Sequence, residues 1–159
     1  MGEIQLRAMS SEDATNLIAR MAHDFALDQV AAGNWDAADA QRLAREEMAR
    51  LLPQAERTDG MALLSAFDED RFVGHVWLCL APRIAQTGEA WLYDIEVEES
   101  ARGRGYGRAL LAAAEAEAAR AGATFLGLNV FGVNRVAHSL YETSGYEVKA
   151  TQMRKRLGD

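Results

Sequence analysis

The sequence has few of the residues that build disulfide frameworks or metal sites. One cysteine among 159 residues excludes an internal disulfide and a zinc site made of cysteines. The three histidines, His23, His75 and His138, are far apart in the sequence, so we expect no metal site. No apolar run approaches the roughly 20 residues of a membrane span, and the first residues lack the basic and apolar regions of a signal peptide. We therefore expect a cytoplasmic protein with no membrane partner, folded as a single domain over residues 1–159.

The charge of the chain, −7 overall, is divided unevenly along the sequence. The first 99 residues carry 8 basic and 19 acidic side chains, whereas the remaining residues carry 9 and 5. An acidic protein is a poor candidate for binding nucleic acid, so we expect no such partner. The division suits two ligands of opposite charge, although composition alone favours a solvated acidic surface without a ligand.

Hydrophobic spacing and turn residues predict ten elements in the order β-α-α-β-β-β-α-β-α-β. The strands are expected over residues 4–8, 61–67, 72–80, 91–97, 124–130 and 146–157. The helices are expected from Ser10 to a stop at Gly33, then over residues 36–52, 107–121 and 134–143. Such an order predicts an α/β (α+β) fold whose mixed sheet carries helices on both faces.

A glycine-rich turn, Arg-Gly-Arg-Gly-Tyr-Gly at residues 102–107, lies between an expected strand and an expected helix. Alternating glycines allow a tight turn and the close approach of a ligand. The amides at the start of the following helix form an anion site, and Arg102, Arg104 and Arg108 add positive charge. The dinucleotide and P-loop patterns both fail here. The turn predicts a pyrophosphate ligand, but it is also consistent with a glycine-rich connection that carries solubilising arginines.

The spacing Arg102-x-x-Gly105-x-Gly107 resembles the R/Q-x-x-G-x-G/A acyl-CoA motif of the GCN5-related N-acetyltransferase (GNAT) family. Residues 93–97 (YDIEV) resemble the fourth strand of that family, residues 127–130 its fifth strand, and residues 134–146 its last helix and turn. The resemblance is specific over residues 91–157 and topological before them. It implies a predominantly antiparallel sheet of six to seven strands, in which the fourth and fifth strands splay apart.

The resemblance also implies the donor and the residues that hold it. Acetyl-CoA is the expected acetyl donor, with no metal, and its pyrophosphate is expected on backbone amides of the turn. The pantetheine arm is expected along the fourth strand, where an amide near Val97 is the oxyanion donor. Asn134 is expected to contact the same arm, and it is also a suitable helix N-cap. The expected acyl-CoA-binding residues are Ile95, Glu96, Val97, Arg102, Gly103, Arg104, Gly105, Tyr106, Gly107, Arg108 and Asn134.

Two residues are candidates for the proton transfers of catalysis. Tyr141 lies where the family commonly has its general acid, and a phenol is protonated at neutral pH; the alternative is a packing tyrosine on an amphipathic helix. Strand alternation places Asp94 and Glu96 on the face opposite Trp91, Tyr93, Ile95 and Val97. Glu96 is the candidate base, directly or through water. Asp94 and ordered water alone are the alternatives, and a carboxylate that only binds the substrate is another.

These features predict transfer of an acetyl group to an amine of a small molecule or protein by direct attack in a ternary complex. The acidic first 99 residues favour a cationic acceptor. A non-catalytic acyl-CoA-binding module is the alternative from another class, and Tyr141 argues against it. A transferase for a longer acyl group, or for a hydroxyl acceptor, is a third possibility.

His75 and Trp77 are candidates to line an acceptor pocket, although any hairpin strand presents such residues. We expect a monomer or a homodimer.

Overall fold

The computed structural model describes residues 2–158, which divide into two compact units. The first unit ends at Asn129 and the second begins at Val130. The strands are β1 (Ile4–Ala8), β2 (Met61–Asp68), β3 (Arg71–Cys79), β4 (Glu89–Val97) and β5 (Phe125–Leu128). The helices are α1 (Ser11–Ala31), α2 (Ala37–Leu51), α3 (Arg83–Thr87), α4 (Tyr106–Arg120) and α5 (Arg135–Thr143), with 3-10 turns η1 (Ala55–Arg57) and η2 (Glu99–Ala101). Of these, only α5 belongs to the second unit, and a single domain over the whole chain remains a prediction.

The sheet of the first unit is mixed and mostly antiparallel, as the order of elements predicted. Its strands follow one another in the order β1-β2-β3-β4-β5. The first three pairs are antiparallel, and the expected hairpin joins β2 to β3. The last pair, β4 with β5, is parallel, which requires a long crossover connection between the two strands. Helix α4 lies in that crossover, directly after the glycine-rich turn.

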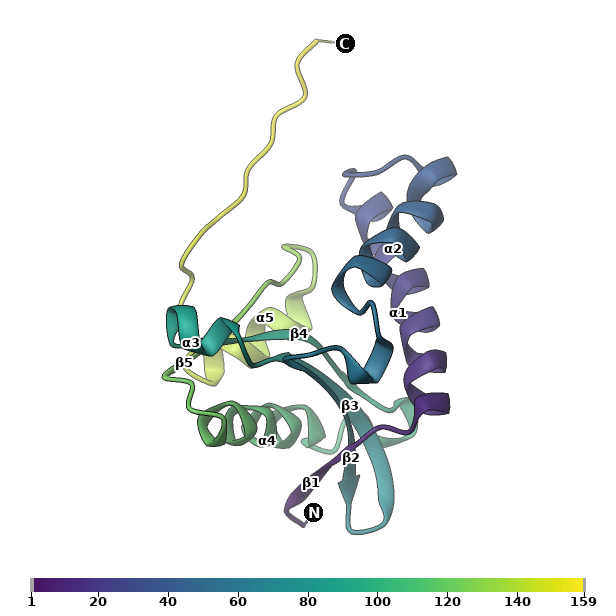
Figure 1. Ribbon diagram of the computed structural model, residues 1–159. Coiled ribbons are helices and arrows are strands. Elements are labelled where there is room, and N and C mark those ends of the chain that lie inside the picture. Colours follow the sequence, from purple (N-terminus) through teal and green to yellow (C-terminus); the bar gives the residue numbers. More distant parts are fainter. Residues whose placement is uncertain (1, 159) are drawn as a thin grey trace. The chain divides into compact units, whose positions relative to one another are not determined.

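Helices cover both faces of this sheet, which confirms the expected layers (Figure 1). On one face, α1 and α2 pack over Leu63 and Trp77, and their contacting side chains form one buried cluster. On the other face, α4 contributes Tyr106 and Leu110 to a second cluster, which includes Val73 of β3. Side chains of alternate residues on a strand point to opposite faces, so β2 and β3 contribute to both clusters.

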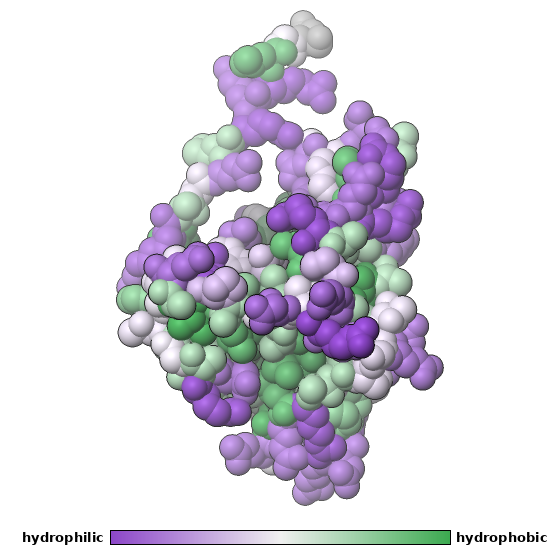
Figure 2. Space-filling model, viewed as in Figure 1, coloured by the Kyte–Doolittle hydropathy of each residue, from purple (hydrophilic) through white to green (hydrophobic). Residues whose placement is uncertain are grey.

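Local sequence accounts for the helical pair on the first face. Ser10 caps α1 by accepting a hydrogen bond from the Asp13 amide at 3.1 Å, and such caps typically stabilise a helix by about 1 kcal/mol. Small buried residues, among them Ala26 and Ala44, allow α1 and α2 to approach closely. The outward side of α2 carries ion pairs of Arg42 with Asp39 and Glu46. Hydrophilic residues accordingly dominate the outer surface of the pair in Figure 2.

The sheet has fewer strands than the six to seven that the family resemblance implied. Residues 2–158 contain five strands, and the segment 146–157, expected as the last strand, contains none. Val148, Met153 and Leu157 of that segment are 72%, 88% and 87% exposed. Alternation of polar and apolar residues shows only that a segment is able to form a strand. The strand forms where a neighbour supplies backbone hydrogen bonds and a face that buries the apolar side chains.

Within residues 2–158, no helix combines the length and the apolar character that crossing a membrane requires.

Candidate functional site

The two halves of β4 differ in their neighbours. Strand β5 pairs with residues 89–92 of β4, and this ladder ends at Leu92 and Leu128. Residues 94–97 pair with β3 on the opposite edge, and in the described part of the chain β3 is their only ladder partner. The sheet therefore opens beside the second half of β4, and Ile95, Glu96 and Val97 lie along that opening.

A glycine determines how closely β3 approaches this half of β4. Gly74 lies opposite Val97, and a Cβ atom at Gly74 would lie 2.1 Å from the carbonyl oxygen of Glu96. Real Cβ atoms do not come so close to another heavy atom. Any other residue at position 74 would therefore displace the backbone that carries Glu96.

A β-bulge resets the alternation of side chains along β4. Trp77 pairs with Asp94 and Leu78 with Leu92, so Tyr93 is the extra residue between them. The ring of Tyr93 stacks on Trp77, with centroids 4.5 Å apart. Tyr93 therefore lies on the α1–α2 face, whereas Ile95 packs in the α4 cluster. The expectation that these two share a face is wrong, because a bulge places two consecutive side chains on one side.

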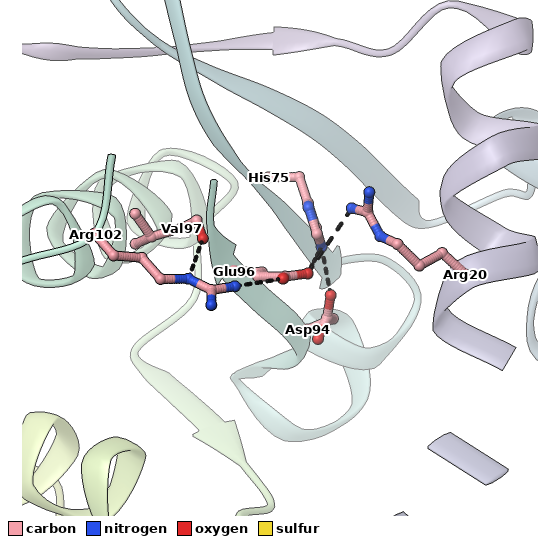
Figure 3. Close-up of polar contacts among 6 residues, drawn as sticks. All are labelled: Arg20, His75, Asp94, Glu96, Val97 and Arg102. Carbon is pink, nitrogen blue, oxygen red and sulfur yellow. Dashed lines mark hydrogen bonds and ion pairs between the residues drawn. The ribbon is translucent and has the colours of Figure 1, made fainter. Parts of the chain in front are cut away.

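Asp94 and Glu96 do share a face, and there they meet a buried histidine. His75 is 2% exposed, and its Nε2 lies 2.5 Å from Oδ2 of Asp94 and 4.0 Å from Oε2 of Glu96. Arg20 of α1 approaches the same Oε2 at 3.8 Å, and Arg102 donates to Oε1 at 3.1 Å. These five residues, the carboxylate cluster, come from α1, β3, β4 and the turn (Figure 3).

Further carboxylates of α1 face this cluster. Burial raises the pKa of Asp28, and the neighbouring charges of Asp24 and Asp94 raise it further. Arg20 and Arg102 offset only part of this negative charge. The α1–α2 face of the sheet beside the end of β4 is therefore an electrostatically favourable place for a cation.

The glycine-rich turn leads from η2 into α4 and has the geometry of an anion site. Gly105 is the N-cap residue of α4 and adopts a left-handed conformation, with φ of 86°. It provides no side-chain cap, so the amides of Tyr106 and Gly107, in the first turn, have no acceptor within the helix. Gly103 is also left-handed, with φ of 74°, and nothing lies within 4 Å of a Cβ built on it. The turn thus presents uncapped backbone donors, beside the exposed side chain of Arg104.

Two side chains of the turn point away from these amides and fix the turn to the sheet. The guanidinium of Arg102 donates from Nε to the carbonyl oxygen of Val97 at 3.1 Å, in addition to its bond to Glu96. Tyr106 is buried, and its hydroxyl donates to Asp68 of β2 at 2.6 Å. This hydrogen bond is the main cause that lowers the pKa of Asp68 and raises the pKa of Tyr106.

The remaining two candidate residues lie in the second unit. Asn134 is the N-cap of α5 and accepts a hydrogen bond from the Ala137 amide at 3.1 Å. This is the capping role that the sequence offered as one of its two roles. Tyr141 lies on α5, and its ring centroid is 5.5 Å from that of Tyr146. The contact of Asn134 with acyl-CoA and the acid role of Tyr141 remain predictions.

Sequence reasoning did not identify the partners of the two carboxylates. The sequence marks His75 only as a candidate to line a pocket, and it carries no signal for Arg20. The pairing of His75 with Glu96 depends on the β3–β4 register, and Arg20 reaches Glu96 across 76 positions of sequence. No local pattern carries either relationship. Among the described residues there is no group of three or more metal-ligating side chains.

Known proteins are similar to this chain in sequence and in architecture. The model of the acetyltransferase (GNAT) family matches residues 27–146. The chain is 34% identical over 155 residues to YycN of Bacillus subtilis (strain 168), named an uncharacterized N-acetyltransferase, covering 97% of this chain and 99% of the relative. YdgE of the same organism, named likewise, is 26% identical over 96% of this chain and 97% of its own length.

Solved structures agree with the sequence matches. The crystal structure of YycN from Bacillus subtilis superposes with a TM-score of 0.92 at 33% identity, covering 98% of this chain and 99% of YycN. The PaiA N-acetyltransferase of Thermoplasma acidophilum, solved in complex with coenzyme A, shares the fold with a TM-score of 0.67 at 23% identity. The superposition covers 94% of this chain and 92% of the PaiA chain. This chain belongs to the GNAT family of acetyltransferases.

Proposed function

We propose that this N-acetyltransferase transfers the acetyl group of acetyl-CoA to an amine of a cationic small molecule or protein, by direct attack in a ternary complex. The observation that carries the proposal is the position of Ile95, Glu96 and Val97. These residues lie beside the opening between β4 and β5, they adjoin the glycine-rich turn, and they include a carboxylate on the α1–α2 face. One short segment thus links an anion site to a negatively charged face.

The turn holds the donor in this proposal. The amides of residues 103–108 bind the pyrophosphate, since they combine exposed donors with the positive end of the α4 dipole. Arg102, Arg104 and Arg108 are proposed to add positive charge. The backbone of residues 95–97 binds the pantetheine arm along the opening, and Asn134 contacts the same arm. The PaiA structure with coenzyme A supports this choice of donor, because it has the same fold.

The carboxylate cluster receives the acceptor. Glu96 takes the proton of the substrate ammonium, directly or through water, which frees the nitrogen lone pair for attack on the thioester carbon. An amide near Val97 stabilises the oxyanion that forms. As the carbon–sulfur bond breaks, the Tyr141 hydroxyl gives its proton to the departing thiolate. The nitrogen loses its second proton as the amide forms, and that proton restores the Tyr141 hydroxyl, directly or through water. The products are the acetylated amine and CoA, and no metal takes part in these steps.

Replacement of Tyr141 by Phe tests the proposed acid. Loss of a general acid lowers kcat by about 100-fold to 10,000-fold, while the dissociation constant for acetyl-CoA should change less than about twofold. Steady-state kinetics and calorimetry measure the two quantities. Tyr146→Phe is the matched control, since its ring adjoins Tyr141. If kcat falls less than about twofold in Tyr141→Phe, the tyrosine is a packing residue.

The proposed function is tested by measuring CoA release over a panel of small amines, polyamines and peptides, together with acetyl-CoA calorimetry before and after EDTA. We expect micromolar or tighter binding that EDTA leaves unchanged, and turnover that is fastest with cationic amines. No binding at tens of micromolar acetyl-CoA would contradict the proposed donor. Binding without turnover on any acceptor would favour a non-catalytic acyl-CoA-binding module, and longer acyl-CoA donors in the same assay test the acyl group. A cytoplasmic location and a monomeric or homodimeric state remain predictions.

A further inference from the structure

Two carboxylates lie close together beside one buried imidazole. Asp94 and Glu96 are two residues apart on β4, so their Cα atoms are separated by about 7 Å. Both side chains point to the His75 ring. Like charges at such a distance disfavour ionisation of both groups, unless a donor or a cation lies between them. The ring of His75 occupies that position.

We propose that His75 is a positioning residue for the acceptor side of the site: its Nε2–H holds Asp94 and thereby leaves Glu96 able to take the proton of the amine. The proposal rests on the proposed function, because it assigns a partner to the carboxylate that acts as base there. His75 itself touches neither substrate nor donor in this role. The ring is buried whereas the Asp94 side chain is 36% exposed, so the hydrogen bond is shielded from water on the side of the ring.

The contacts distinguish the two carboxylates. A ring nitrogen carries one hydrogen, and Nε2 lies within hydrogen-bond distance of Asp94 but 4.0 Å from Glu96. Oε1 of Glu96 accepts from Arg102. In the part of the chain that the structure describes, the neighbours of Oε2 are Arg20 at 3.8 Å and the His75 ring, both beyond hydrogen-bond distance. Asp94 is therefore bound by the ring, while Oε2 of Glu96 remains available to a substrate proton.

The charged groups around the ring come from β4, α1 and the turn after η2. Asp94 and Glu96 lie on β4, Arg20 on α1, and Arg102 in the turn after η2. Asp24 and Asp28 of α1 contribute to the electrostatic field at these groups, because Asp28 interacts electrostatically with both Asp24 and Asp94. On β2, the residue paired with His75 in the sheet is Ser65, which carries no charge. Removal of the ring donor therefore leaves the negative charge of Asp94 uncompensated beside Glu96, while Arg20 and Arg102 stay in place.

Direct titration of the carboxylates tests the proposal without any acceptor. Protein labelled with ¹³C at the Asp and Glu side-chain carboxyls is titrated by NMR as wild type, His75→Phe and His75→Gln. The ring of Phe donates no hydrogen bond, so the Asp94–Glu96 pair should titrate about one pH unit higher than in wild type. The amide of Gln places a donor where Nε2 lies, so its midpoints should stay within about 0.3 unit of wild type.

Val76→Ala is the matched control, because Val76 is the neighbour of His75, is equally buried and faces the other side of the sheet. It should lower the thermal stability without moving either carboxyl titration. Midpoints in His75→Phe within about 0.3 unit of wild type would overturn the proposal. A shift in His75→Gln as large as that in His75→Phe would also overturn it, since the donor would then be irrelevant. If His75→Phe does not fold, His75→Leu replaces it, because Leu also lacks a donor, and midpoints within about 0.3 unit of wild type in that variant overturn the proposal.

Kinetics then connect the cluster to turnover. In His75→Phe the acidic limb of the pH profile of kcat/KM for the amine should shift to higher pH together with the carboxyl titration midpoints. The acetyl-CoA dissociation constant should stay within about twofold of wild type. A second substitution, Asp94→Asn, removes the repelling charge and should return the limb to its wild-type position. If this double variant loses all turnover, Asp94 is itself the base and the positioning role is wrong. Absence of turnover in wild type would contradict the proposed function instead, and the NMR result would stand by itself.

Discussion

The glycine-rich turn and the carboxylate cluster meet at Arg102, but one is a backbone site and the other a side-chain site. The turn presents backbone amides, and its side chains at Arg102 and Tyr106 point back into the protein. The cluster consists of side chains from four places in the fold: α1, β3, β4 and the turn. A backbone site depends on conformation alone, whereas a side-chain site depends on residue identity and on register. We infer that substitutions alter the acceptor side more readily than the donor side.

Arg102 connects the two regions. Its guanidinium bonds both to the Val97 carbonyl and to Glu96, so the last residues of β4 and the start of the turn share one side chain. The comparison predicts that variants of the turn change the binding of acetyl-CoA, whereas variants of the cluster change reaction with the amine. The variants below test this division.

The largest effect is expected for Glu96→Gln. The amide keeps the size of the side chain but does not accept the ammonium proton. The value of kcat/KM for the amine should fall by about 100-fold or more, as expected for loss of a general base, and the acidic limb of its pH profile should disappear. Binding of acetyl-CoA, measured by calorimetry, should change little.

Glu89→Gln is the matched control for this variant, because Glu89 also lies on β4 and forms an ion pair, with Arg83 at 2.6 Å. It should leave the pH profile unchanged. An unchanged limb with a raised KM for the amine in Glu96→Gln would make Glu96 a substrate-binding carboxylate. The limb would then belong to the amine itself or to another group such as Asp94.

Gly105→Val should weaken acetyl-CoA binding by about tenfold to 100-fold. The left-handed backbone at Gly105 costs about 1–2 kcal/mol for a residue with a side chain, and a branched residue adds bulk beside the exposed amides. Calorimetry measures the change. Gly122→Val places the same strain at the other end of α4, with φ of 95° and open space around it. It should reduce thermal stability but leave the affinity intact; equal losses of affinity in the two variants would show that strain in α4, rather than the turn itself, is responsible.

Tyr106→Phe should raise the acetyl-CoA dissociation constant only a few-fold, the scale of one lost hydrogen bond, because the phenol positions the turn without touching the ligand. Its effect on melting temperature should depend on pH. The pKa of Asp68 is lowered in the folded protein, so the stabilisation is present above its ordinary value near 3.8 and is lost as the pH falls through the lower folded value. The pKa of Tyr106 is raised, so this contribution is also lost as the pH rises above about 10.

The difference in melting temperature between wild type and Tyr106→Phe should therefore be large near pH 7 and should shrink below about pH 4. Scanning calorimetry from pH 3 to pH 8 measures it. A difference that stays constant over this range would mean that the hydrogen bond to Asp68 does not stabilise the fold.

The smallest effect is expected for Arg108→Ala. Arg108 is exposed in the first turn of α4, and an exposed charge contributes at most about 1 kcal/mol. The acetyl-CoA dissociation constant should rise by about fivefold or less at low salt, and the difference should diminish in 0.5 M salt. A loss as large as that of Gly105→Val would show that side-chain charge, and not backbone, dominates the donor side.

The sequence alone predicted most elements of the fold and one of the two regions. Helices α1, α2 and α4 and the β2–β3 hairpin follow from periodicity, caps and turn residues, which act over a few neighbouring positions. The glycine-rich turn was predictable for the same reason, since Gly105 is needed where the backbone is left-handed. Even the shared face of Asp94 and Glu96 follows from strand alternation over three residues.

Tertiary structure decided what depends on pairing between distant segments. The bulge at Tyr93 belongs to the β3–β4 register, and it moved a ring to the face opposite the one that alternation predicted. The same register brings His75 to Asp94, and the packing of α1 on the sheet brings Arg20 to Glu96. The segment after Gly145 has the composition of a strand but no ladder partner within residues 2–158. Local propensity acts through neighbours in the sequence, whereas register, bulges and ion pairs are fixed by the free energy of burying whole faces against each other.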